Sequence, residues 1–320
     1  MIVLTGPTAV GKTKLSIALA KAVGGEIISA DSMQVYRYMD IGSAKVMPDE
    51  MKGVPHHLID VLEPQEEFNV VRFQQMAKNA MKEIYSRGHI PIVTGGTGFY
   101  IQALVRDIDF TETGEEDSVL EDSCSEQISF RTHLEQLAAS QGPQALYSML
   151  LQTDPESAAS IHPNNVKRVI RALEYYELTG SPISRHNEEQ RQKVSPYQYI
   201  CFVLNRDRAV LYDRINRRVD QMIKDGLVEE VKQLADRGYT RDMVSMQGLG
   251  YKEILDYLNG EGTLEDAVYK IKRDTRHFAK RQITWFKREK EIQWIQMEDF
   301  DSEEAVLEKM LSLCAEKGIV

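Results

Sequence analysis

The fold of this chain is decided close to its N-terminus, by the stretch Ile2-Val3-Leu4-Thr5-Gly6-Pro7-Thr8-Ala9-Val10-Gly11-Lys12-Thr13. Its apolar start predicts a short buried strand, and residues 6–13 fit the phosphate-binding loop pattern G-x-x-x-x-G-K-T/S. Glycines let the backbone N–H groups of such a loop turn toward phosphate oxygens. A helix that starts directly after the loop adds its positive end to the anion site. The stretch therefore predicts a nucleotide-binding site of the P-loop type found in ATP-binding proteins.

Two side chains of this loop carry most of its chemistry. Lys12 supplies a mobile positive charge to the outer phosphate, and the Thr13 hydroxyl is placed to bind Mg²⁺, the cofactor that we expect. A chance match is the alternative, but a strand before the loop and a helix after it argue against chance. The predicted diphosphate-binding residues are Gly6, Pro7, Thr8, Ala9, Val10, Gly11, Lys12 and Thr13.

The composition is that of an ordinary globular protein, with 320 residues, 42% hydrophobic, 28% charged and a net charge of −10. This charge argues against a generic nucleic-acid coat, although local basic faces can lie on an acidic protein. The three cysteines are far apart and form no C-x-x-C pair, which indicates neither a zinc site nor a disulfide framework. No leader and no membrane-spanning apolar run is visible, so we expect a cytoplasmic protein without a membrane partner.

Two further strand–loop–helix units predict an α/β fold with an open parallel sheet. Residues 26–30 form a strand pattern that ends at Asp31, and residues 89–93 form another that runs into Thr97 and a helix from Phe99. Ligands bind at the carboxyl ends of the strands in such sheets. We therefore expect the loops at Gly6, Asp31 and Thr97 to meet at one edge of the sheet.

The strand pattern lapses at residues 111–127, an acidic and Ser-rich run that we interpret as a linker or mobile loop. Helical patterns follow at about 129–151, 155–160 and 163–178, and Gly180 and Pro182 close that block. We predict one core domain made of residues 1–110 and 199–320, with a helical insertion over residues 111–198.

The second half of the predicted core domain also contains patterns that mark the starts of strands and helices. Residues 199–204 have a strand pattern, and Asp207 is a candidate cap for a helix that runs to residue 225. Thr263 resembles the start of a capping box for a long helix to about residue 290. A last strand is expected at residues 292–295.

Several polar residues are candidates for the chemistry of the site. Asp31 can hold Mg²⁺ through water or act as a base, whereas the alternative is a turn former. Thr97 can donate to a leaving oxygen or simply cap a helix. Arg214 and Arg218, four apart, share a helix face and can neutralise a diphosphate, while Arg217 points elsewhere. Such arginines often only line a solvated face.

Basic stripes predict a nucleic-acid surface, although a solvated helix face is the alternative. One stripe on the long helix contains Lys272, Arg276 and Lys280, and the adjacent stripe contains Arg273, His277 and Arg281. A second basic patch lies in the helical insertion at residues 167–171. The glycines in the segment 247–252 can allow close approach of a base or can form a structural turn.

Taken together, the chain resembles the bacterial tRNA dimethylallyltransferases, also called tRNA isopentenyltransferases. The resemblance spans nearly the whole chain in order. It rests on the residues 6–13 and on the strings Asp31-Ser-Met-Gln-Val-Tyr36, Met39-Asp-Ile-Gly-Ser-Ala-Lys45, Pro55-His-His-Leu58, Gly95-Gly-Thr-Gly-Phe-Tyr100, Ile161-His-Pro-Asn164, Arg168-Val-Ile-Arg-Ala-Leu-Glu174, Gly250-Tyr-Lys-Glu253 and Thr275-Arg-His-Phe-Ala-Lys-Arg-Gln-Ile-Thr-Trp285.

The resemblance implies a nucleotide-kinase-like sheet core with an inserted all-helical domain that grips the anticodon arm. It implies transfer of a dimethylallyl group from dimethylallyl diphosphate to the exocyclic amine of the adenosine just 3′ of the anticodon in tRNA. Asp31 would be the general base, Thr97 would contact the bridging oxygen of the diphosphate, and Arg218 and Lys12 would bind the diphosphate. We expect a monomer, with tRNA and this diphosphate as its partners.

The resemblance also implies a set of tRNA-binding residues spread over six segments. These are Asp31, Ser32, Met33, Gln34, Thr97, Arg131, Lys167, Arg168, Val169, Ile170, Arg171, Gln247, Gly248, Leu249, Gly250, Tyr251, Lys252, Thr275, Arg276, His277, Phe278, Ala279, Lys280, Arg281 and Gln282.

Three other functions fit parts of the pattern. A small-molecule kinase also has a phosphate-binding loop, but it has no use for the basic helices. A prenyltransferase of free adenine nucleotides would not need the helical insertion. A noncatalytic RNA-binding module would not need Asp31.

Overall fold

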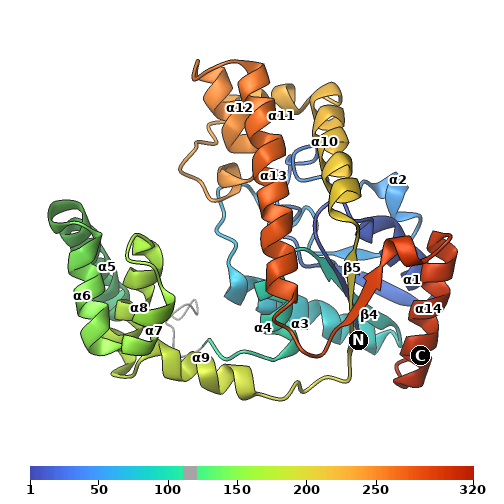
Figure 1. Ribbon diagram of the computed structural model, residues 1–320, viewed down its shortest axis with the longest axis horizontal. Helices are drawn as coiled ribbons and strands as arrows, with labels where there is room; N and C mark the ends of the chain where they lie inside the picture. The colour runs from blue at the N-terminus through green and yellow to red at the C-terminus, as the bar shows by residue number, and fades with distance from the viewer. Residues whose placement is uncertain (111–120) are drawn as a thin grey trace. The chain divides into compact units, whose positions relative to one another are not determined.

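The computed structural model describes residues 1–110 and 121–320, which form two compact units (Figure 1). One unit combines residues Met1–Val105 and Tyr197–Val320, and the other is Arg106–Pro196. The chain therefore leaves its first unit, builds the second, and returns. The unit boundaries lie within a few residues of the predicted ones at 111 and 198. We call the first the core unit and the second the helical unit, and describe each by itself.

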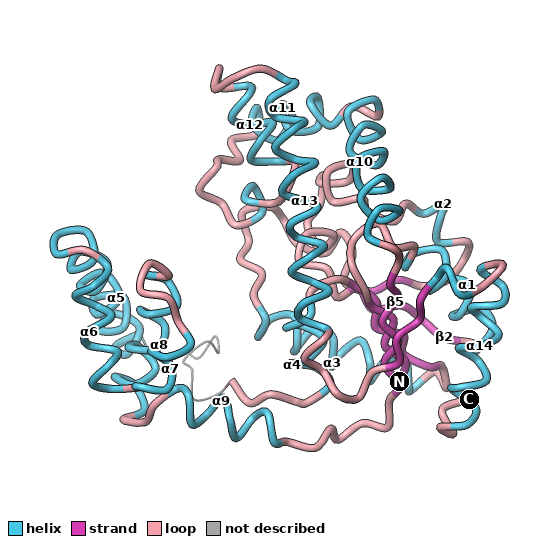
Figure 2. Tube along the Cα trace, viewed as in Figure 1, coloured by secondary structure: helices cyan, strands magenta, loops and turns pink. Residues whose placement is uncertain are grey.

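The core unit is built on a six-stranded sheet in which every pairing is parallel (Figure 2). The strand order is β3-β2-β4-β1-β5-β6, so that β1 lies between β4 and β5. This confirms the predicted α/β fold with a parallel sheet. The strands are β1 (Ile2–Thr5), β2 (Gly25–Ser29), β3 (His56–His57), β4 (Ile90–Gly95), β5 (Ile200–Asn205) and β6 (Gln293–Gln296).

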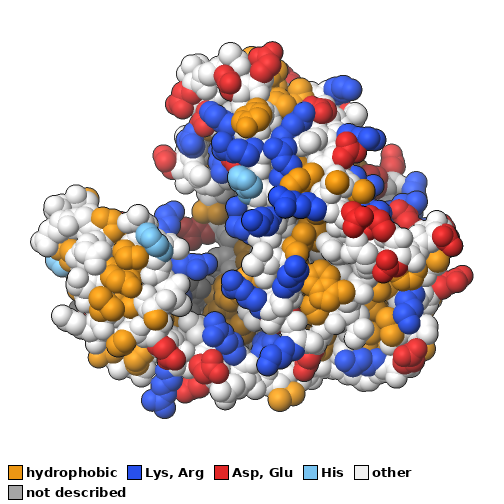
Figure 3. All heavy atoms as spheres, in the orientation of Figure 1, with side chains coloured by type: hydrophobic (Ala, Val, Ile, Leu, Met, Phe, Trp, Pro, Cys, Tyr) orange, Lys and Arg blue, Asp and Glu red, His pale blue; other side chains and the backbone are white. Residues whose placement is uncertain are grey.

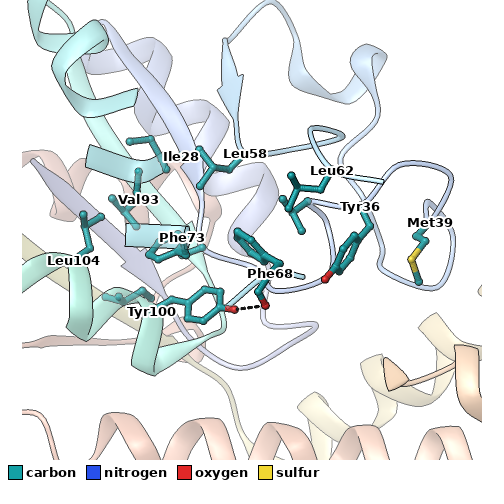
Figure 4. Packing of buried hydrophobic residues seen from close by; sticks show 14 of the residues in the cluster. Ile28, Tyr36, Met39, Leu58, Leu62, Phe68, Phe73, Val93, Tyr100 and Leu104 are labelled. Atoms are coloured by element: carbon teal, nitrogen blue, oxygen red, sulfur yellow. Dashed lines mark hydrogen bonds between the residues drawn. The ribbon is translucent and has the colours of Figure 1, made fainter. Parts of the chain in front are cut away.

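Both faces of this sheet are buried, because successive strand residues point to opposite faces. Val3 packs into one hydrophobic cluster and Leu4 into another. On the first face, Phe73 stacks on Tyr100 with ring centroids 4.7 Å apart, and Phe68 meets Tyr100 edge-on (Figure 4). These rings join the helices after Asn69 and Thr97 to the sheet and so fix the loops above it.

The core unit contains helices on both sides of the sheet, and the predicted cap at Thr263 is confirmed. The Asn69 side chain accepts from the N–H of Arg72, and Thr263 accepts from the N–H of Asp266. Asp207 lies at the predicted N-cap position of α10, but its side chain makes no cap hydrogen bond. The helices are α1 (Lys12–Val23), α2 (Pro48–Met51), α3 (Val70–Ser86), α4 (Gly98–Val105), α10 (Arg208–Lys224), α11 (Leu227–Asp236), α12 (Tyr251–Leu258), α13 (Leu264–Phe286) and α14 (Glu303–Glu316).

A buried carboxylate ties together the amino ends of three strands. Glu26, 2% exposed on β2, accepts two hydrogen bonds from the guanidinium of Arg87, at 2.9 and 2.8 Å. His57 Nε2 and His89 Nδ1 each lie 2.7 Å from its oxygens. The Arg87 hydrogen bonds, followed by those of the histidines, lower the pKa of Glu26 to about 2 against the effect of burial. This cluster lies at the opposite ends of these strands from Asp31 and Thr97.

The helical unit consists of α5 (Glu121–Gln141), α6 (Pro143–Thr153), α7 (Pro155–Ser160), α8 (Val166–Thr179) and α9 (Ile183–Gln192). Its core includes Leu134, Leu146 and Leu173. Three sequence predictions need correction here. Residues 121–127 are helical rather than linker, the Gly142–Pro143 step splits the helix predicted at 129–151, and α9 follows Pro182 where no helix was expected. Residues 111–120 of the predicted linker lie outside the described residues.

No helix in the described part of the chain is long and apolar enough to cross a membrane.

Candidate active site

Three loops meet at the carboxyl edge of the sheet, as the sequence predicts. They follow β1, β2 and β4, and hydrogen bonds join them to one another. The N–H of Thr97 donates to the carbonyl of Ala30 at 3.3 Å, and the Thr5 hydroxyl donates to the carbonyl of Gly95 at 2.7 Å. Asp31, next to Ala30, and Thr97 are therefore held close to the phosphate-binding loop.

At two positions of this edge only glycine fits, because there is no room for a side chain. Gly6 has φ +141°, and a Cβ added to it would lie 2.4 Å from the carbonyl oxygen of Leu204. A Cβ at Gly95 would lie 2.1 Å from the carbonyl oxygen of Ala30. Any side chain at either position would push neighbouring strands apart, so these glycines keep the three loops in contact.

Lys12 reaches back over the loop from the first turn of α1. Its ammonium donates to the carbonyls of Gly6 and Pro7, both at 2.9 Å. Burial, followed by repulsion from nearby Arg218, lowers the pKa of Lys12 to about 8, and Asp31 opposes the shift. The site therefore holds a poorly solvated cation that gains stability from a bound anion.

Helix α10 places two arginines on the same loop, which confirms that they share one face. Arg218 donates to the Thr8 hydroxyl at 3.4 Å, and Arg214 donates to the carbonyl of Ala9 at 2.8 Å. Arg217, as expected, points elsewhere, because its side chain is 80% exposed and pairs with an aspartate of its own helix. Burial, followed by repulsion from Arg214, lowers the pKa of Arg218.

Asp31 provides the carboxylate of the site. Its Oδ1 accepts from the N–H of Met33 at 2.9 Å, which closes a tight turn after β2. Its negative charge raises the pKa of both Lys12 and Arg218, so it acts on both cations of the loop. One carboxylate and two half-buried cations therefore share this site, and a reaction there can move a proton next to a bound anion.

Gln282 links the loop to the turn after β4. It is 6% exposed on α13, its Oε1 accepts from the N–H of Thr8, and its Nε2 donates to the carbonyl of Gly96, both at 2.9 Å. A Cβ at Gly96 would lie 2.2 Å from this Nε2. Its amide is therefore occupied within the protein, and its contact with RNA stays a prediction.

Sequence reasoning missed Glu230, which holds the turn at residues 40–43. Its carboxylate accepts from the N–H groups of Asp40, Ile41 and Gly42 at 3.0, 2.7 and 3.1 Å. The Tyr251 hydroxyl donates to the same carboxylate at 2.8 Å. The sequence contained only an indirect sign of this contact. The string 39–45 is one of the motifs on which the family resemblance rests, but the resemblance assigned no function to it.

This turn borders a cavity of 620 Å³ that reaches Arg218. Its lining mixes polar side chains with the apolar groups of Ile41 and Met222. The cavity therefore opens onto the cationic end of the phosphate-binding loop.

Comparison with known proteins places the chain in a family. The family model described as IPP transferase matches residues 34–289. The chain belongs to this family. A tRNA dimethylallyltransferase of Lachnoclostridium phytofermentans is 58% identical over 320 residues, covering 100% of this chain and 99% of that protein. One of Thermoanaerobacter sp. is 48% identical, covering 99% of this chain and 98% of that protein.

Solved structures agree with membership in the IPP transferase family. The full-length tRNA isopentenylpyrophosphate transferase of Bacillus halodurans has a TM-score of 0.72 at 46% identity, covering 99% of this chain and 95% of that one. A eukaryotic dimethylallyltransferase acting on tRNA has a TM-score of 0.81 at 31% identity, covering 99% of this chain and 79% of that one.

Several residues predicted to contact RNA have buried side chains. Val169 and Ile170 lie in the core of the helical unit, and Tyr251 and Ala279 lie in the core unit, all at most 4% exposed. Their side chains pack inward because they lie on the apolar faces of their helices, and their contacts with RNA stay predictions. Gly248 packs against Met33, since a Cβ there would lie 2.5 Å from its methyl group, which favours the structural interpretation of this glycine.

The basic residues of α13 differ in whether they have partners within the protein. Lys272 pairs with Asp220 at 2.6 Å and Arg276 donates to Asn216 at 2.6 Å, so both face α10. Lys280 is exposed and has no acidic partner among the described residues. Figure 3 shows lysine and arginine side chains gathered along the length of α13.

The basic residues of the helical unit are mostly exposed. Lys167 and Arg168 lie on the surface of α8. Arg131 forms a two-pronged hydrogen bond with Glu174 at 2.7 and 2.8 Å. Their contacts with RNA, and those of the remaining predicted residues, stay predictions.

Proposed function

We propose that this chain transfers a dimethylallyl group from dimethylallyl diphosphate to the exocyclic amine of the tRNA adenosine just 3′ of the anticodon. Membership in the IPP transferase family implies the reaction class, transfer of this group to a tRNA adenosine. One observation supports the finer assignment above others: the Asp31 carboxylate acts electrostatically on both Lys12 and Arg218. Base and anion cradle therefore belong to a single site.

The cradle would bind the diphosphate and neutralise the leaving group. An allylic diphosphate ionises readily when its developing negative charge is stabilised by preorganised donors. Lys12, Arg218 and the N–H groups of the loop would provide that stabilisation, and the Thr97 hydroxyl would donate to the bridging oxygen. Desolvation strengthens these contacts, because Lys12 and Arg218 are already poorly hydrated.

Asp31 would act as the general base on the adenine amine. The C–N bond forms at C1 of the allyl group as its C–O bond breaks, the electron pair leaves with the diphosphate, and one amine proton passes to the Asp31 carboxylate. Adenine amines are weak nucleophiles, so removal of this proton favours the transfer. A stacked base cannot reach the site, so the adenosine would be flipped out of the anticodon loop.

We expect Mg²⁺ to enter the site together with the diphosphate substrate. The described residues contain no group of three or more His, Cys, Asp or Glu side chains able to hold a metal ion by themselves. Mg²⁺ commonly takes few protein ligands and completes its shell with phosphate oxygens and water. The Thr13 hydroxyl would provide the protein contact. When bound, the ion would neutralise diphosphate charge.

RNA binding would use α13 and the basic residues of the helical unit. Loop bases expose edges and stacking faces, which suits recognition of an anticodon stem-loop. We further propose that the protein acts as a monomer in the cytoplasm.

The direct test incubates the protein with dimethylallyl diphosphate, Mg²⁺ and unmodified tRNA, and analyses the tRNA nucleosides by mass spectrometry. The expected product is a prenylated adenosine at the position 3′ of the anticodon. An anticodon stem-loop should replace tRNA, whereas AMP should not. Turnover of ATP without prenylation, or prenylation of AMP in preference to the stem-loop, would contradict the proposal.

A further inference from the structure

A second pocket of the core unit lies at the first turns of α10, whereas the cavity beside the 40–43 turn lies at the C-terminal half of the same helix. Its volume is 510 Å³, within the range of small-ligand sites. It lies where β5 and β6 end, between the first turns of α10 and the last turns of α13. We call it the Lys287 pocket. Its lining includes Asn205, Arg206, Arg208, Tyr212, Lys280 and Lys287.

The charge of this pocket suits an anion. Four cationic side chains line it against one carboxylate, that of Asp207. Arg206 is already engaged, with the carbonyl of Val10 at 3.1 Å and with Glu298 at 3.2 Å. Lys280 and Lys287 are exposed and have no acidic partner among the described residues. Two mobile ammonium groups therefore remain to bind a phosphate.

Arg208 adds a stacked, planar cation to the same pocket. Its guanidinium carbon lies 5.1 Å from the centre of the Tyr212 ring. Cation–π contact orients a guanidinium without consuming its outward N–H donors. This pair presents a fixed donor fork, which suits a phosphate of a nucleic-acid backbone.

Asn205 supplies a buried acceptor that lacks a donor. Glu298 has only acceptor oxygens, so the Gln296 amide must turn its NH₂ group toward Glu298, at 2.8 Å. The Gln296 oxygen then accepts from Asn205 Nδ2 at 3.0 Å. This order leaves Asn205 Oδ1 buried without a partner. An unpaired buried acceptor is costly, and a hydroxyl from a ligand would satisfy it.

We propose that the Lys287 pocket binds a ribose-phosphate unit of the tRNA backbone, outside the base that reacts. The phosphate contacts Lys280, Lys287 and Arg208, and the ribose 2′-hydroxyl donates to Asn205 Oδ1. The pocket continues along α13 from the predicted RNA segment 275–282, since Lys280 belongs to both. This inference rests on the proposed function, because it assumes that tRNA is the substrate.

The test measures the affinity of the full-length protein for unmodified tRNA over a range of salt concentrations. Lys287→Ala and Arg208→Ala should each weaken binding and lower the slope of log affinity against log salt by roughly 0.7–0.9. Lys309→Ala is the matched control, because it removes an equal, exposed charge from α14 and should leave the slope unchanged. Slopes equal to wild type in both pocket variants would overturn the proposal.

A second arm tests the ribose contact. Stretches of 2′-deoxyribose are introduced into the tRNA one at a time, and binding is measured with wild type and with Asn205→Ala. For one of these stretches, the substituted tRNA should bind wild type more weakly than unsubstituted tRNA does. The same substitution should not weaken binding to Asn205→Ala any further. A loss of thermal stability in the variant would not produce this pattern. If no stretch does so, or if both proteins respond equally, the ribose contact is wrong.

A free nucleotide also contains a ribose and a phosphate, so it is the alternative ligand for this pocket. AMP and ATP are titrated into wild type and Lys287→Ala without RNA. Nucleotide binding that is lost in the variant, with tRNA affinity intact, would assign the pocket to a free nucleotide and overturn the RNA proposal. If wild type binds no tRNA at all, the proposed function fails rather than this inference.

Discussion

The side-chain oxygen of Gln282 accepts a hydrogen bond from the backbone N–H of Thr8 at 2.9 Å, although 274 residues separate them. The amide nitrogen of the same side chain binds the carbonyl of Gly96. A buried residue of the basic helix α13 thus holds the phosphate-binding loop against the loop that contains Thr97. If RNA docks on α13 as proposed, this side chain would connect its docking mechanically to the diphosphate site.

Gln282→Ala should raise the KM for dimethylallyl diphosphate and destabilise the fold. It leaves the buried carbonyl of Gly96 unpaired, at a cost of about 1–3 kcal/mol, and also frees the half-buried N–H of Thr8. Steady-state kinetics and urea unfolding measure the two effects. Gln233→Ala, on the surface of α11, is the control and should change neither. An unchanged KM in the Gln282 variant would show that the link does not shape the loop.

Asp31→Asn should lower kcat by about 10²–10⁴-fold, the usual contribution of a general base. Asparagine keeps an oxygen that can accept from the N–H of Met33, so the turn after β2 is retained. Affinity for tRNA should change much less than kcat. Single-turnover prenylation and tRNA binding separate these effects. Full activity in this variant would remove Asp31 from the mechanism.

Arg218→Ala should weaken use of the diphosphate by about ten- to a hundredfold, because a charge-assisted hydrogen bond contributes about 1.5–3 kcal/mol. Arg217→Ala is the matched control on the same helix, since its side chain is 80% exposed and points away. The measurement is kcat/KM with varied dimethylallyl diphosphate. Equal losses in both variants would point to general charge rather than to a specific contact.

Binding of the diphosphate should weaken as pH rises above 8. Burial holds the pKa of free Lys12 at about 8, and a bound anion raises that pKa. Binding therefore takes up a proton between about pH 8 and the higher bound-state value, so affinity is greatest below pH 8. The loss cannot exceed about tenfold per pH unit for one proton. Calorimetry in buffers of different ionisation enthalpy counts the protons.

The control for this pH effect is Lys12→Arg, whose guanidinium stays charged over the same range. Its affinity should be independent of pH between 8 and 10. The same pH dependence in both proteins would assign the titration to another group.

Glu26→Gln should destabilise the core unit at neutral pH by about 3 kcal/mol. The folded-state pKa of Glu26 is about 2, below its ordinary value of 4.5. Its contribution to stability is therefore complete above pH 4.5 and is lost as the pH falls toward 2. Urea unfolding at several pH values measures it, with the exposed Glu308→Gln as control. A wild-type stability that is flat from pH 5 to 3, matched by the variant, would contradict this assignment.

The sequence by itself determined the parallel sheet, the phosphate-binding loop and the meeting of Asp31 and Thr97 at one edge. Each follows from local information: apolar strands need burial, glycines permit turns, and the ends of parallel strands share an edge. The face shared by Arg214 and Arg218 follows from helical spacing alone. The start of α5 and the existence of α9 did not follow, because polar helices give a weak periodic signal.

Only the tertiary structure decided which side chains are free to act. From the sequence, Gln282 is one polar residue within a predicted RNA-binding segment. In the structure it is buried between two loops that lie far from it in the chain. Lys272 and Arg276 face α10, whereas Lys280 does not. Glu230 was invisible because the N–H groups that it binds lie in a turn about 190 residues earlier. Sequence patterns describe one element at a time, but a side chain's role depends on what other elements bring against it.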